Sequence, residues 1–72
     1  MEVLNLALTN RERQILELLA RGRTEKGAAR ELGISNRAVG NRTRDIRQKM
    51  GVDSTKAAIV IAQRYNLIEI EG

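Results

Sequence analysis

The sequence predicts an all-α fold of four short helices. Proline is absent from the 72 residues, and the good helix formers Ala, Leu, Arg and Glu are abundant. Apolar residues also recur at helical spacing in four segments, which three glycines separate. A chain of this length is enough for one domain, which we take to span residues 1–72.

The first two helices are marked by capping residues and glycines. Thr9 and Glu12 have the spacing of a capping box, so the first helix should begin at Thr9 and end at Gly22. Its expected buried stripe consists of Ile15, Leu16, Leu18 and Leu19. The second helix should begin at Thr24 and end at Gly33. The residues expected to turn inward from it are Ala28, Ala29 and Leu32.

The third helix should begin at Ser35, a good N-cap, and end at Gly51. Its inward residues are expected to be Ala38, Val39, Ile46 and Met50. The fourth should begin at Asp53 or Ser54 and run to about Tyr65, with Asn66 suited to cap its end. The apolar tail is expected to pack back onto the helices, and it contains Leu67, Ile68 and Ile70.

The junction between the second and third helices is very short, because only three residues join Leu32 to Asn36. Such a link makes two helices cross steeply, as in a helix-turn-helix unit. Small Ala29 allows the helices to approach, and Gly33 can adopt the positive φ that the turn requires. Ile34 and Val39 should fill the angle between the two helices. The spacing of these residues matches the general helix-turn-helix pattern.

Positive charge is concentrated in the third helix. The chain carries a net charge of +4, and residues 35–50 alone contain five basic residues against Asp45. Those five are Arg37, Arg42, Arg44, Arg47 and Lys49. A cluster of this kind is typical of a surface that binds a polyanion. The alternative is a basic face that is merely solvated.

Composition argues against several other classes of function. The chain has no Cys and no His, so we expect no thiolate or histidine metal site, no cofactor and no enzyme activity. The single aromatic residue, Tyr65, disfavours base stacking on single strands. No apolar run reaches the ~20 residues of a membrane span, and Met1–Leu4 lacks a signal peptide's basic region. We therefore expect a cytoplasmic protein with no membrane partner.

Several stretches between residues 8 and 68 form a recognisable set, namely Leu8-Thr9-Asn10-Arg11-Glu12, Ile15-Leu16, Ala29-Arg30-Glu31-Leu32-Gly33-Ile34-Ser35 and Lys49-Met50-Gly51-Val52. In these stretches the sequence resembles the C-terminal DNA-binding domain of LuxR-type bacterial transcription regulators, also known as the FixJ or NarL type. The resemblance implies four helices, binding to double-stranded DNA and dimerisation through the last helix. The chain departs from the family at residues 38–42, which read Ala-Val-Gly-Asn-Arg where Thr-Val-Lys-x-His is usual. Another departure is Gly27-Ala28-Ala29, where the family usually has Glu-Ile-Ala.

The recognition helix is therefore expected at 35–50, with its first turns in the major groove. Helical phase gives as candidate base contacts Asn36, Arg37, Gly40, Asn41 and Arg44, where an Arg can pair with guanine and an Asn with adenine. The candidate phosphate contacts are Arg23, Thr24, Lys26, Arg42, Arg47 and Lys49. For Asn41 and Arg44 the alternative is phosphate contact or solvation, and for Thr24 it is a pure helix cap.

Gly40 stands out within this helix, because glycine costs a helix interior about 1 kcal/mol relative to Ala. One interpretation is that it lets the backbone approach the base edges closely. The other is that it is a tolerated, slightly destabilising residue.

The fourth helix is apolar nearly all round. One stripe, formed by Ala58, Ile59 and Ala62, is assigned to the core. The other side is a candidate dimer interface, by symmetry with a second copy, and contains Ala57, Val60, Ile61 and Arg64. The alternative is that the C-terminal tail covers this stripe.

The leading hypothesis is a sequence-specific transcription regulator that binds an inverted repeat as a homodimer, with half-sites roughly 10 bp apart. RNA polymerase is a possible further partner. A second hypothesis is a monomeric promoter-contacting module resembling region 4 of bacterial sigma factors. A third is a protein-interaction adaptor that keeps the fold but has lost DNA binding, which would show no salt-sensitive affinity for DNA.

Overall fold

Four helices account for the regular structure of residues 7–69, the part of the chain that the computed structural model describes. They are α1 (Asn10–Ala20), α2 (Glu25–Leu32), α3 (Asn36–Met50) and α4 (Thr55–Arg64). No strand occurs within this range. The all-α prediction and the order of the four helices are therefore confirmed, and the third helix has the predicted bounds.

Each helix begins at a hydroxyl side chain that caps a backbone N–H. The four N-caps are Thr9, Thr24, Ser35 and Ser54, and each hydroxyl accepts from the amide three residues on at 3.0–3.1 Å. In α1 the Thr9 amide also donates to Glu12 Oε1 at 3.0 Å, which completes the predicted capping box. Asn66 follows α4 with a positive φ of 58°, so it fits the predicted place at that helix end.

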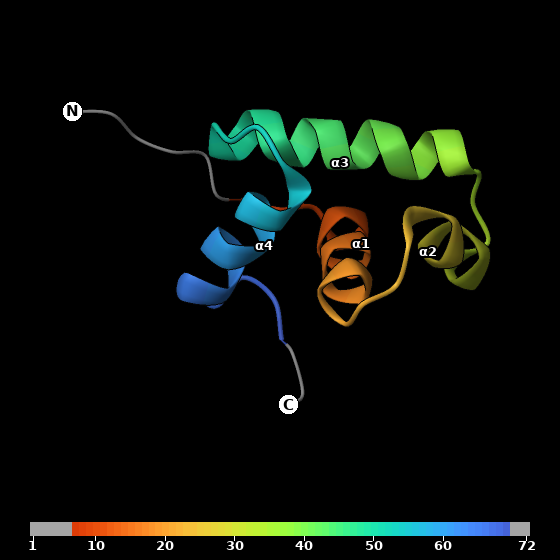
Figure 1. Ribbon diagram of the computed structural model, residues 1–72, viewed down its shortest axis with the longest axis horizontal. Coiled ribbons are helices and arrows are strands. Elements are labelled where there is room, and N and C mark those ends of the chain that lie inside the picture. The colour runs from red at the N-terminus through yellow and green to blue at the C-terminus, as the bar shows by residue number, and fades with distance from the viewer. Residues whose placement is uncertain (1–6, 70–72) are drawn as a thin grey trace.

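The longest helix, α3, lies across the other three, as Figure 1 shows along its upper edge. Both α1 and α3 contact each of the other helices, whereas α2 and α4 do not contact one another. α2 and α4 are therefore held together only through α1 and α3.

The core consists of two clusters that share α1 and α3. The larger cluster joins α1, α3, α4 and the C-terminal segment, through Leu16, Ile46, Met50, Ala58, Ala62 and Ile68. The smaller cluster joins α1, α2 and α3, through Ile15, Ala29 and Val39. The predicted inward residues Leu19 and Leu32 are only half-buried and pack against the smaller cluster from its edge.

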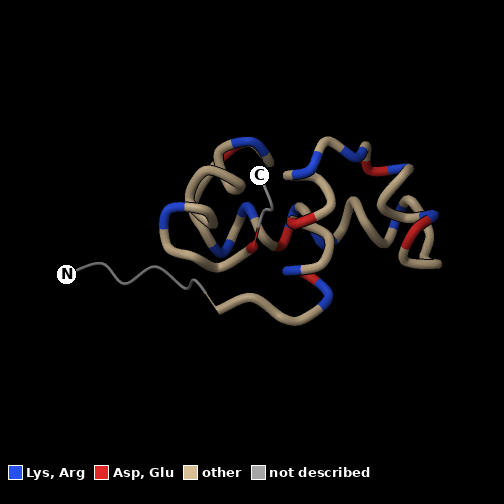
Figure 2. Tube along the Cα trace, turned by 90° about the horizontal axis from the view of Figure 1, so that it is seen from below, with Lys and Arg blue, Asp and Glu red and all other residues tan. Residues whose placement is uncertain are grey.

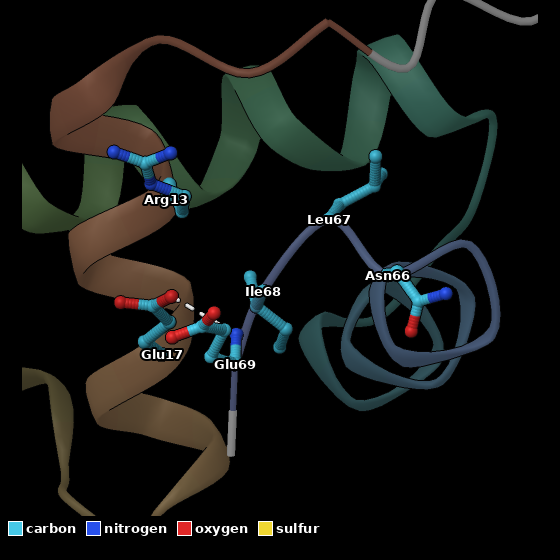
Figure 3. Close-up of a pocket in the computed structure, with 6 residues that line it drawn as sticks. All are labelled: Arg13, Glu17, Asn66, Leu67, Ile68 and Glu69. Atoms are coloured by element: carbon cyan, nitrogen blue, oxygen red, sulfur yellow. Dashed lines mark hydrogen bonds between the residues drawn. The ribbon is translucent and has the colours of Figure 1, made fainter.

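The C-terminal segment packs back onto the helices, as predicted. Ile68 is buried in the larger cluster, and Leu67 packs against it. The Glu69 amide donates to Glu17 Oε2 of α1 at 3.0 Å, which is the dashed line in Figure 3. The prediction for Ile70 lies outside the described residues.

The turn between α2 and α3 has the geometry that the sequence predicts. Gly33 ends α2 in the left-handed conformation, at φ 70° and ψ 32°. The Ile34 amide then donates to the Ala29 carbonyl at 3.0 Å, which closes the last turn of α2. Ala29 is only 3% exposed, so its methyl group fills the space between the crossing helices.

None of the helices within residues 7–69 is both long enough and apolar enough to cross a lipid bilayer.

Replacing Ala29 by Leu should lower the free energy of unfolding by about 1–3 kcal/mol, because extra methylenes would force α2 and α3 apart. Urea unfolding followed by circular dichroism measures this change. The matched control is Arg30→Leu at the exposed neighbouring position, which should alter stability by no more than about 0.5 kcal/mol. Equal stability of Ala29→Leu and the parent would show that the crossing has spare room.

Candidate nucleic-acid interface

The outer face of α3 carries the predicted base contacts. Its inner face is closed by Val39, Thr43, Ile46 and Met50, each no more than 2% exposed. The spacing of these four residues keeps them on one side of the helix. Four of the candidate base contacts are exposed, namely Asn36, Arg37, Asn41 and Arg44. Gly40 is half-buried at the boundary between the two faces.

Basic residues occur on all four helices, and acidic residues interrupt them along most of the trace (Figure 2). α3 differs in its excess of positive charge, because its fifteen residues include five basic ones and a single acidic one, Asp45. Its basic side chains therefore lack nearby carboxylates of their own helix, apart from Asp45. The positive potential of this helix is directed outward, since its opposite face is buried.

The start of α2 lies beside the middle of α3. Thr43 Oγ1 lies 3.5 Å from Glu25 Oε2, where Glu25 is the first residue of α2. Thr24 Oγ1 accepts from the Gly27 amide at 3.0 Å, which confirms the capping role for Thr24. Its predicted contact with a phosphate stays a prediction. Lys26 is exposed at the same helix end.

Arg23, which precedes α2, forms an ion pair with Glu31 of α2, because its Nε lies 3.3 Å from Glu31 Oε1. Both side chains are about half exposed, at 52% and 50%. Exposed pairs of this kind contribute little to stability, so Arg23 can exchange this partner for another anion at small cost.

Lys49 is engaged inside the domain. Its Nζ lies 2.7 Å from Glu12 Oε1 and 3.2 Å from the carbonyl oxygen of Ala7. The Glu12 side chain is 3% exposed and that of Lys49 is 25% exposed. Glu12 was expected only in the capping box, and Lys49 was expected to contact a phosphate. The ion pair gives both residues a further role, because it holds the end of α3 against the start of α1.

The Glu12 carboxylate titrates below its ordinary range. Burial by itself raises its pKa, but hydrogen bonds from Lys49 and the Thr9 amide, together with the charge of Lys49, outweigh burial and lower the pKa. Glu12 is therefore ionised at neutral pH and keeps its cation partner.

Arg47 and Arg42 differ in their surroundings. Arg47 is half-buried and its guanidinium donates to Thr55 Oγ1 at the start of α4, at 3.2 Å. Arg42 is exposed. Of the two, Arg42 has the more exposed side chain, and the phosphate contact of each stays a prediction.

The predicted dimer surface on α4 is smaller than expected. Val60 is 50% exposed, and Arg64 is exposed on the same helix. Ala57 is half-buried. Ile61 was placed on the outer side, but it is half-buried and packs against the larger core cluster. Leu67 of the C-terminal segment packs against the same cluster.

A hollow of about 400 Å³ lies between α1 and the C-terminal segment (Figure 3). It is lined by Arg13, Glu17, Asn66, Leu67, Ile68 and Glu69. None of the predicted contact residues lines it, so it forms no part of the candidate interface.

Two features of the site were missed at the level of sequence. Thr43 was not placed in the core because it is polar, although its spacing from Val39 and Ile46 matches the buried face. Its hydroxyl is satisfied by donating to the Gly40 carbonyl at 2.9 Å. The pairing of Lys49 with Glu12 joins residues 37 positions apart, and no local pattern indicates such a contact.

Comparisons with known proteins agree with this geometry. The family described as "Bacterial regulatory proteins, luxR family" matches residues 6–62. Spore germination protein GerE of Bacillus subtilis is 40% identical over 63 residues, which are 88% of this chain and 85% of that protein. A solved structure of the transcription factor GerE superposes with a TM-score of 0.85 at 34% identity, and covers 89% of this chain and 96% of that one.

Longer regulators match as well. The transcriptional regulatory protein YdfI of Bacillus subtilis is 34% identical over 65 residues, and MctR of Rhizobium johnstonii is 32% identical over 65 residues. These matches cover 90% of this chain but only 30% of each of those proteins.

Replacing Lys49 by Met should lower the free energy of unfolding at pH 7 by about 1–3 kcal/mol, because the buried Glu12 carboxylate loses its cation. Glu12→Gln keeps an oxygen for the capping box, and the double-mutant cycle should yield a coupling of about 0.5–3 kcal/mol. Arg42→Met, at an exposed position of α3, is the matched control. Unchanged stability of Lys49→Met would mean that the pair contributes nothing.

The same pair should respond to acid. The folded-state pKa of Glu12 is lowered, so its contribution is fully present above the ordinary value of 4.5 and is lost as pH falls through the folded value. The stability difference between the parent and Glu12→Gln should therefore shrink progressively below that pH. Urea midpoints measured between pH 7 and pH 3 test this, and a pH-independent difference would contradict it.

Proposed function

The chain belongs to the luxR family of bacterial regulatory proteins, and from that membership we propose that it regulates transcription by binding specific sequences of double-stranded DNA. The observation that carries the proposal is the two-sided character of α3. Its inner face is buried by both core clusters, while its outer face presents exposed Arg and Asn side chains. A helix with these properties fits the major groove of B-DNA, which admits one α-helix.

In the proposed complex, the first turns of α3 read the base edges. Arg37 and Arg44 are long enough to donate two hydrogen bonds each to guanine O6 and N7, and Asn41 can pair with adenine N6 and N7. Asn36 and Gly40 lie in the same turns of the helix. Contacts to bases would give the preference for sequence, because phosphate contacts carry none directly.

The phosphate contacts are proposed on either side of this helix. Lys26 and the free amides at the start of α2 suit one backbone strand, with Thr24 and Arg23 beside them. Arg42 and Arg47 suit phosphates further along. Lys49 is engaged with Glu12, so we give it the role of positioning α3 instead of contacting DNA.

Two copies are proposed to meet through α4. Val60 is half exposed, and Ala57 and Arg64 lie on the same helix, with Ile61 at the edge of the surface. An apolar patch this small fits a weak dimer that forms mainly on DNA, where two half-sites hold the copies close together. A dimer related by two-fold symmetry would bind an inverted repeat. We also propose RNA polymerase, bound nearby, as a further partner. The proposed compartment is the cytoplasm, where bacterial DNA lies.

Selection of bound duplexes from a randomised pool at near-physiological salt should enrich an inverted repeat with half-sites roughly 10 bp apart. On that site Arg44→Ala and Asn41→Ala should each cost about 1–3 kcal/mol and relax the preference at one position per half-site. Arg42→Ala should weaken binding to all sequences alike and reduce the salt slope by about 1.

The other outcomes of the selection separate the alternatives. A single unrepeated motif would favour a monomeric promoter-contacting module. A failure to bind any duplex even at low salt would overturn DNA binding and leave the adaptor hypothesis.

Val60→Glu should weaken binding to the two-half-site duplex several-fold and leave binding to a single half-site unchanged, because it places a charge in the proposed contact between copies. Gel-shift titrations on both duplexes measure this. Gln14→Glu, at an exposed position of α1, adds the same charge outside the contact. If both variants weaken binding equally, the effect is general charge repulsion from DNA and the α4 contact is wrong.

A further inference from the structure

Gly40 lies in the middle of α3, where glycine destabilises a helix relative to alanine. Glycine at such a position is usually explained by a backbone with positive φ or by neighbouring atoms that leave no room for a Cβ. Neither explanation applies to Gly40. The φ of Gly40 is not among the positive values in the described chain. Apart from its chain neighbours and the backbone of its own helix, no heavy atom lies within 4 Å of the place that a Cβ would occupy.

The other described glycines differ from Gly40 in this respect. Gly22, Gly33 and Gly51 have φ values of 98°, 70° and 68°, which side chains rarely adopt. A Cβ on Gly27 would stand 3.3 Å from Thr24 Oγ1, the oxygen that caps α2. Gly40 is therefore the one glycine between residues 7 and 69 that the fold itself leaves unexplained.

At Gly40 the backbone carries no side chain, and a hydrogen bond from a buried residue fixes its carbonyl. The Gly40 carbonyl accepts from Thr43 Oγ1 at 2.9 Å, and Thr43 is 2% exposed in contact with the core face. One helical turn away in either direction stand Asn36, Arg37 and Arg44, all with exposed side chains. The missing side chain thus leaves the helix backbone uncovered at this point, and a Cβ placed there would meet open space among the polar side chains proposed to read bases.

We propose that Gly40 is a specificity-determining residue, and that the space left open by its missing side chain receives the 5-methyl group of a thymine in the major groove. This inference rests on the proposed function of the same helix. Thymine carries a methyl group at its major-groove edge, whereas the edges of the other three bases carry polar donors and acceptors. The Cα of Gly40 offers that methyl group an apolar contact and the room to approach.

The test compares the parent chain with Gly40→Ala and Gly40→Ser on the duplex that selection by the parent chain enriches. The first variant occupies the open space and favours the helix, so its melting temperature should rise by about 4–8 °C. The second occupies the same space with a smaller gain in helix propensity. Both should bind the selected site about tenfold more weakly, and the parent's preference for thymine at one position per half-site should disappear in both.

A second measurement leaves the protein unchanged. Each thymine of the half-site is replaced in turn by deoxyuridine, which removes only the methyl group. At the position facing Gly40 the parent should lose about fourfold in affinity, the amount expected for one buried methyl group. At the same position both variants should lose nothing. Gln14→Ala, on the exposed side of α1, serves as the control that a changed helix propensity alone does not alter DNA affinity.

The outcomes are distinct. Binding by Gly40→Ala that equals or exceeds that of the parent would overturn the inference while leaving DNA binding intact, and so would a parent that is indifferent to every deoxyuridine. A parent that binds no duplex at low salt would overturn the proposed function, and the inference with it.

Discussion

The buried face of α3 is shared by both core clusters, and this shared face is the constraint on which the rest of the structure depends. Val39 belongs to the cluster with α2, and Ile46 and Met50 belong to the cluster with α4. α1 contributes one of two adjacent residues to each cluster, with Ile15 in the smaller cluster and Leu16 in the larger one. Because α3 is fixed along its whole inner side, its outer side is free to carry charges that no core could accept.

The features that the sequence predicts well are those set by near neighbours in the chain. The four N-caps, the capping box of Thr9 and Glu12, and the left-handed Gly33 all depend on residues no more than five positions apart. The helix-turn-helix junction follows from them, since its three-residue length leaves few ways to cross two helices. This is why the fold and the bounds of α3 could be predicted without any knowledge of tertiary contacts.

The features that the sequence does not predict depend on distant residues or on competition for the same surface. In the sequence Lys49 cannot be distinguished from the other basic residues of this helix, and only the tertiary arrangement brings Glu12 to it. The sequence pattern places Ile61 on an outer stripe of α4, yet the side chain is half-buried and packs against the larger core cluster. Thr43 is an exception, because its spacing does match the buried face and its hydroxyl donates to an acceptor within its own helix.

The division of the core into two clusters gives the domain two parts of unequal cohesion. α2 is anchored by a cluster of three buried residues, whereas α4 and the C-terminal segment share one of six. Local opening is easiest where the fewest apolar contacts must separate, so the smaller cluster predicts that α2 detaches more readily than α4. α2 and α3 together form the candidate interface, so a duplex that bridges them would also close the weaker part of the domain. Recognition and rigidity would then be coupled quantities in this protein, each reinforcing the other.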